Sequence, residues 1–165
     1  MLRPSIFQIL ISLILFSDFV QAQSYCVKND MAKLFPALED NSKPPTKAPI
    51  YTPLLGTGNR RETHGEMWAE VIDADAQKFW VQKSNLTTKW NCLVVNVGRT
   101  SLRSGPGKNF APAKTRFAQK HQAYVDLGGE DGWTQVKDKS GETFWMNIDH
   151  VWKAKSKMRI SFEGH

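Results

Sequence analysis

Five basic residues surround a short stretch rich in glycine and proline in the second half of the chain, and their side chains are suited to holding an anion. They are Arg99, Arg103, Lys108, Lys114 and Arg116. A guanidinium group binds carboxylate or phosphate oxygens through paired hydrogen bonds, and an ammonium group binds them as a point charge. Asn109 and Phe110 add an amide and an aromatic ring to the same stretch. We therefore predict a binding site for an anionic ligand at Arg103, Lys108, Asn109 and Phe110, with a charged, solvated loop as the alternative.

Trp133 and Trp145 complete this candidate site. Aromatic side chains dominate both the cores of small β folds and the walls of ligand grooves, so the sequence leaves both interpretations open for these residues. Alternation along a strand places Trp145 on the face opposite to that of Phe144.

Residues for catalysis or metal binding are scattered. The four histidines have no second histidine or cysteine at a metal-ligand spacing; they are His64, His121, His150 and His165. The acidic pairs Asp73 and Asp75, and Glu130 and Asp131, fall in segments that read as turns, which explains them without chemistry. We expect no catalytic site, no metal and no cofactor, and hence a protein that is not an enzyme.

The first 22 residues have the three parts of a secretory signal peptide. Arg3 lies near the start, an apolar run covers residues 6–16, and small residues precede a cut after Ala22. The alternative is a membrane anchor, but the run is shorter than the ~20 residues that span a bilayer. We expect a secreted or periplasmic protein with no transmembrane segment after cleavage.

Export to an oxidising compartment favours a disulfide between the two cysteines, Cys26 and Cys92. A nucleophilic cysteine is the alternative.

The formal net charge of +6 suggests an anionic partner. In an exported protein that partner is an envelope component rather than nucleic acid, although solubility alone is a sufficient explanation of the charge.

Two kinds of secondary structure are predicted along the mature chain. Apolar residues at helical spacing predict a short amphipathic helix between Val27 and Leu38, and the proline-rich residues 41–49 predict an extended linker. Beyond residue 50, short runs rich in aromatic and β-branched residues alternate with turn residues, which predicts an all-β fold. The expected strands are residues 67–72, 78–81, 92–97, 123–127, 133–136 and 143–146, with hairpin turns at 73–76, 128–132 and 138–141.

The β region contains an internal repeat with an offset of 65 residues. Without a gap, the pairs that then match are Trp68 with Trp133, Val71 with Val136, Asp73 with Asp138, Phe79 with Phe144 and Trp80 with Trp145. Each copy reads as a strand, a turn and a second strand.

Residues 101–110 read Ser-Leu-Arg-Ser-Gly-Pro-Gly-Lys-Asn-Phe and resemble the signature of the bacterial SH3 domain family. Residues 132–136 and 141–146 resemble the two strands that follow it in that family. The similarity covers residues 93–152 and departs from the usual pattern at Phe144 and at residues 100–102. We expect the loop glycines to supply positive φ. The earlier copy lacks the loop and is degenerate.

The resemblance implies an SH3-like barrel in the second half of the chain, and the internal repeat predicts a degenerate SH3-like barrel before it, after the short helical segment. The expected divisions are a signal peptide at 1–22, a helical segment and linker at 23–47, and SH3-like domains at 48–88 and 89–157. It also implies a non-catalytic module that binds peptidoglycan, its stem peptides or another envelope component. The alternative is a secreted scaffold, adaptor or inhibitor with a protein partner.

Overall fold

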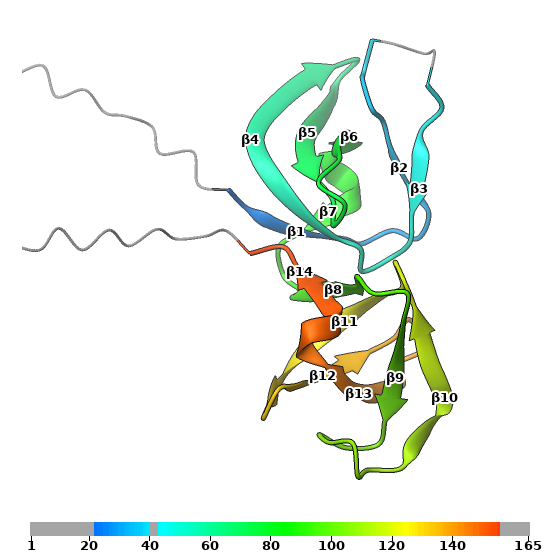
Figure 1. Ribbon diagram of the computed structural model, residues 1–165. Coiled ribbons are helices and arrows are strands. Elements are labelled where there is room, and N and C mark those ends of the chain that lie inside the picture. Colours follow the sequence, from blue (N-terminus) through cyan, green and yellow to red (C-terminus); the bar gives the residue numbers. More distant parts are fainter. Residues whose placement is uncertain (1–21, 40–42, 156–165) are drawn as a thin grey trace, which may run out of the picture.

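The computed structural model describes residues 22–39 and 43–155, and these residues form an almost entirely β structure (Figure 1). The predicted signal peptide, apart from Ala22, lies outside the described residues. Among the residues described, no helix is both long and apolar enough to cross a membrane.

The first part of the chain forms an antiparallel sheet of five strands in the order β6-β5-β4-β1-β7, which we call the N-terminal unit together with its two-stranded hairpin β2-β3. The sheet strands are β1 (Ser24–Val27), β4 (Pro53–Thr63), β5 (Glu66–Ile72), β6 (Lys78–Gln82) and β7 (Leu86–Thr87). The hairpin consists of β2 (Ala32–Leu34) and β3 (Thr46–Ala48). A single 3-10 turn, η1 (Lys83–Asn85), precedes β7.

The second part forms a seven-stranded antiparallel sheet in the order β10-β9-β13-β12-β11-β8-β14, which we call the C-terminal unit. Its strands are β8 (Cys92–Val95), β9 (Arg99–Arg103), β10 (Pro112–Gln119), β11 (Ala123–Glu130), β12 (Trp133–Lys137), β13 (Thr143–Asn147) and β14 (Val151–Lys153). The 3-10 turn η2 (Ile148–His150) precedes β14. Neither large sheet closes on itself within the described part of the chain. The all-β class and all six predicted strands are confirmed.

The internal repeat is confirmed at the level of strand register. Trp68 lies opposite Gln82 in the β5-β6 pair, and Trp133 lies opposite Asn147 in the β12-β13 pair, an offset of 65 on both strands. The likeness also reaches strands that the sequence did not predict. Val27 of β1 pairs with β7, as Val95 of β8 pairs with β14. In each unit the first strand therefore pairs with the last.

The predicted helix between Val27 and Leu38 is wrong, because this segment forms β1 and β2. The spacing of its apolar residues fits a helix only by coincidence. Burial instead alternates along β2, where Ala32 and Leu34 face the core and Lys33 faces solvent. Met31 turns the chain between the strands with φ 60°, and Phe35 then makes an isolated bridge with Trp80.

Each unit has its own hydrophobic core. The N-terminal core includes Val27, Leu54 and Val71, and the C-terminal core includes Val95 and Val136, all of them with no exposed surface. The repeated residues Val71 and Val136 fill equivalent core positions, and so do Phe79 and Phe144, which are 6% and 5% exposed. The sequence repeat thus corresponds to two hydrophobic cores that are packed separately, one in each unit.

The turns after β5 and β12 give a direct test of this equivalence. In each turn an aspartate, Asp73 or Asp138, accepts two backbone N–H bonds at 2.9 to 3.0 Å through Oδ1. The fourth turn residue has a positive φ, 61° at Ala76 and 90° at Gly141. In this conformation a residue with a Cβ atom is less stable than glycine by about 1–2 kcal/mol. Part of this advantage of glycine is lost, because glycine has more conformational freedom in the unfolded chain and loses more of it on folding.

Ala76→Gly should therefore raise the free energy of unfolding by about 0.5 kcal/mol, and Gly141→Ala should lower it by about 1 kcal/mol. Urea unfolding of the two variants measures both changes. A loss of stability in Ala76→Gly would contradict the assigned turn geometry.

Candidate functional site

The loop between β9 and β10 is held closed by its own backbone. Ser104 donates to the Ala111 carbonyl through both N and Oγ, at 3.0 and 3.2 Å, and Gly107 N donates to the Gly105 carbonyl at 3.0 Å. The ring of Phe110 lies on Gly105, because a Cβ atom there would come within 2.2 Å of it.

This contact corrects the expected function of the loop glycines. Gly105 and Gly107 are not among the residues with positive φ. Gly105 is needed because it leaves room for the ring of Phe110, which remains 42% exposed, and Gly107 leaves room for the side-chain amide of Asn109.

Arg103 is fixed between this loop and the sheet. Its Nη1 donates to the Phe110 carbonyl at 3.1 Å, whereas its buried Nε has no hydrogen-bond partner. In the sheet, Arg103 lies directly opposite Trp145, which in turn lies opposite Gln135. Residues opposite one another in an antiparallel sheet have their Cβ atoms about 5 Å apart on the same face. The structure therefore brings Arg103, Trp145 and Gln135 together in one row.

Trp133 lies on the same face, two residues before Gln135 on β12 and opposite Asn147. Both Trp133 and Trp145 are half-buried, while Phe144 and Val136 point to the core on the other face, as alternation predicts. We call Arg103, Phe110, Trp133, Gln135 and Trp145 the Arg103 face. Lys108 and Asn109 are exposed on the loop beside it.

Sequence reasoning missed one member of the Arg103 face, Gln135, and an exposed aromatic residue on the strand next to Arg103, Phe117. Gln135 was hidden because its position depends on strand register. Phe117 of β10 is 43% exposed and lies opposite Ser101, with the guanidinium of Arg99 over its ring at 4.4 Å. The alternating pattern of β9 and the position of Phe117 next to Arg116 could have indicated the contact between Arg99 and Phe117.

The basic side chains around the Arg103 face keep their charge available. None of the ion pairs found in the described residues involves Arg99, Arg103, Lys108, Lys114 or Arg116. This surface can therefore attract carboxylate or phosphate groups, and its aromatic rings can pack against the apolar parts of a ligand.

The corresponding face of the N-terminal unit is different. Phe35 takes the position of Arg103, and its ring meets that of Trp68 edge to face at 5.4 Å. Arg61 lies over Trp80 at 5.4 Å, but its guanidinium is already paired with Glu39 at 2.7 Å. This face is packed by aromatic contacts and its arginine charge is compensated.

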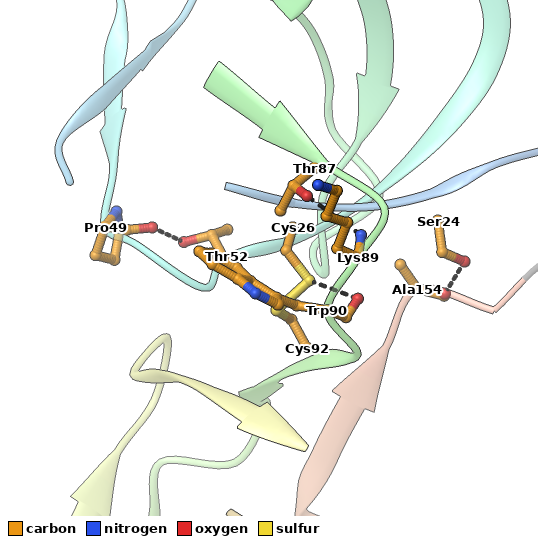
Figure 2. Close-up of a disulfide and its surroundings, with 9 residues drawn as sticks. All are labelled: Ser24, Cys26, Pro49, Thr52, Thr87, Lys89, Trp90, Cys92 and Ala154. Carbon is orange, nitrogen blue, oxygen red and sulfur yellow. Dashed lines mark hydrogen bonds between the residues drawn. A yellow bond between two sulfur atoms is a disulfide. The ribbon is translucent and has the colours of Figure 1, made fainter. Parts of the chain in front are cut away.

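The predicted disulfide between Cys26 and Cys92 is confirmed, and it joins β1 of one unit to β8 of the other (Figure 2). Polar contacts reinforce the junction. Asp75 of the N-terminal unit accepts from Lys120 at 3.2 Å and lies 2.8 Å from His121 Nε2, and Ser24 Oγ donates to the Ala154 carbonyl. The hydrogen bond from Lys120 lowers the pKa of Asp75 below its usual value. His121, isolated in the sequence, thus contacts the other unit.

Two histidines lie next to threonine hydroxyls, and neither arrangement is suited to catalysis. His150 Nδ1 is 2.8 Å from Thr100 Oγ1, but Thr100 is only 3% exposed, so a substrate cannot reach its hydroxyl. His64 Nδ1 is 3.0 Å from Thr63 Oγ1 in an exposed turn, and no carboxylate among the described residues pairs with its ring to orient it. Over residues 22–39 and 43–155, no three His, Cys, Asp or Glu side chains lie close enough together to hold a metal ion.

Neither a protein-family model nor a curated protein sequence matches this chain.

Proposed function

We propose that the chain is a non-catalytic binding protein of the bacterial cell envelope, built from two SH3-like units, and that its Arg103 face recognises peptidoglycan or its stem peptides. The strand pairing supports the SH3-like assignment. In each unit a 3-10 turn leads into a last strand that pairs with the first, which is the pairing that bends a small sheet toward a barrel. The two units also match in a further pairing. Phe35, which follows β2, pairs with Trp80 of β6, and Arg103 of β9 pairs with Trp145 of β13, the residue that the repeat matches with Trp80.

The observation that carries the proposal is the environment of Arg103. The loop carbonyl of Phe110 holds one guanidinium nitrogen, and the charge has no carboxylate partner among the described residues. A guanidinium fixed in this way loses little conformational entropy when it binds a carboxylate. Peptidoglycan stem peptides carry free carboxylates beside apolar methyl groups, which suits a cation flanked by Trp145 and Phe110.

The disulfide supports a location outside the cytoplasm, because such bonds persist in oxidising compartments. Together with the signal-like first 22 residues, it supports secretion or residence in the periplasm.

Co-sedimentation with purified peptidoglycan tests the proposal. Wild-type protein should bind, and Arg103→Ala should bind about tenfold more weakly, a loss of about 1.4 kcal/mol in binding free energy. Added salt should weaken wild-type binding, because the charges at this surface are exposed.

The matched control is Arg61→Ala in the N-terminal unit, since Arg61 also lies by a repeated tryptophan but is already paired with Glu39. This variant should sediment like the wild type. Failure of the wild type to sediment, or equal binding by Arg103→Ala, would refute the peptidoglycan proposal.

A protein partner is the second candidate, and strand β10 favours it. This strand ends the seven-stranded sheet, with Phe117 exposed on it and Arg99 exposed on the neighbouring strand β9. The free edge of a sheet can pair with an extended segment of another protein. Absence of wall binding would make this candidate the leading one.

A further inference from the structure

A basic groove beside β1 is separate from the Arg103 face. It has a volume of about 590 Å³, and its lining includes Tyr25, Lys28, Lys83, Lys89 and Trp90. The volume falls within the ~300–1,000 Å³ typical of small-molecule sites. These residues come from β1 and the residue after it, from the 3-10 turn η1, and from the segment that leads to the disulfide.

The charge of this groove is uncompensated. Among the residues described, no acidic side chain lines the groove. None of the ion pairs formed by the described residues includes Lys28, Lys83 or Lys89. Ammonium groups gathered around one hollow repel one another unless an anion lies between them. The groove therefore favours a ligand with negative charge.

Trp90 provides a rigid aromatic wall. Its ring meets that of Tyr51 edge to face at 5.3 Å, and its carbonyl oxygen lies 3.2 Å from Cys26 Sγ of the disulfide (Figure 2). The side chain is nevertheless 38% exposed. An indole that is held in place and still exposed offers a flat apolar surface, and the C–H face of a sugar ring packs well against such a surface.

The repeat shows that the fold does not require two of these lysines. Lys28 N donates to the Asn85 carbonyl at 2.9 Å, and Asn96 N makes the same bond to the His150 carbonyl at 3.0 Å. Lys83 begins η1 as Ile148 begins η2. The C-terminal unit thus forms the same structure with asparagine and isoleucine at the two positions, and the lysines are free to serve a ligand.

We propose that this groove is a second binding site and that it takes an anionic saccharide, in which carboxylate or phosphate groups meet the lysines and a sugar ring packs on Trp90. This site does not depend on the Arg103 face, and the two can be tested separately.

Isothermal titration calorimetry with soluble saccharides tests the inference. One arm uses an oligogalacturonate, which is carboxylated, and another uses a phosphorylated mannan fragment. At least one of them should bind, and a neutral galactan fragment and inorganic polyphosphate should bind at least tenfold more weakly. The two charged arms distinguish a carboxylate from a phosphate as the preferred anion.

The double variant Lys28→Asn, Lys83→Ile should reduce saccharide binding at least tenfold, and its circular dichroism should be unchanged because the C-terminal unit carries these residues already. Lys33→Asn, Lys78→Asn removes the same charge from exposed positions outside the groove and should leave binding intact, as should Arg103→Ala. Binding to neither charged saccharide, equal binding by the groove variant, or equal binding of polyphosphate would overturn the inference.

Discussion

Replacing Cys26 and Cys92 with alanine should lower the free energy of unfolding by about 4 kcal/mol. The two cysteines are 66 residues apart in sequence, so their bond restricts a long loop in the unfolded chain. It also ties β1 to β8, and each of these strands is hydrogen-bonded on both sides within its own unit. Both cysteines are buried, at 2% and 7% exposed, so the bond forms part of the packed junction.

Urea unfolding of the oxidised wild type and the double alanine variant measures this loss. Reduced wild-type protein is the control, and its midpoint should fall close to that of the variant. Equal midpoints for the oxidised wild type and the variant would show that the bond adds nothing to stability.

Asp126→Ala should cost about 3 kcal/mol, because it would leave the Lys153 charge without a partner in a largely buried position. Asp126 accepts from Lys153 Nζ at 2.5 Å, from Thr134 Oγ1 at 2.7 Å and from Gly128 N at 3.1 Å. The side chains of Asp126 and Lys153 are 12% and 17% exposed. This carboxylate therefore links β11, β12 and β14 of the C-terminal sheet.

Acid should reveal the same interaction. Burial raises the pKa of Asp126, but the hydrogen bonds from Lys153, Thr134 and Gly128 outweigh burial and hold the pKa below its usual value. A carboxyl group with a lowered folded-state pKa stabilises the fold above its unfolded pKa of about 4, and this contribution is lost as the pH falls through the folded pKa. Wild-type stability should therefore fall more steeply below about pH 4 than that of Asp126→Ala.

Urea midpoints measured across the acid range check both expectations for Asp126. Asp126→Ala, Lys153→Met should recover part of the loss at neutral pH, because the unpaired ammonium group is then absent. An equal acid response in the wild type and Asp126→Ala would contradict the assigned hydrogen bonds.

Local patterns in the sequence were enough to predict much of the β structure. The strand pairs that begin at Trp68 and Trp133 carry alternating burial, and their turns contain Asp73 and Asp138, whose side chains cap the backbone locally. The strands β1 and β2 were missed because their pairing is not local. Tyr25 lies opposite Leu54, and Val27 lies opposite Leu86, partners that no short window of sequence contains.

The same distinction applies to the candidate sites. Arg103, Lys108, Asn109 and Phe110 are close in sequence, and they could be predicted together. The row from Arg103 through Trp145 to Gln135 depends on three strands, so only the register reveals it. The basic groove depends on two stretches of the chain that are far apart in sequence, residues 23–28 and 83–90. Its one local signal was the neighbouring pair Lys89 and Trp90, which lies just before Asn91 and the disulfide cysteine Cys92.

The most direct test of the Arg103 face is NMR of nitrogen-15-labelled protein titrated with a soluble peptidoglycan fragment that carries its stem peptide. The chain has six tryptophans, so each indole N–H reports on its own surface. We predict that the signals of Trp145 and Trp133 shift, together with the amide signals of Arg103 and Phe110, while those of Trp68 and Trp80 stay in place. Shifts confined to the N-terminal unit, or no shifts at all, would contradict recognition of peptidoglycan by the Arg103 face.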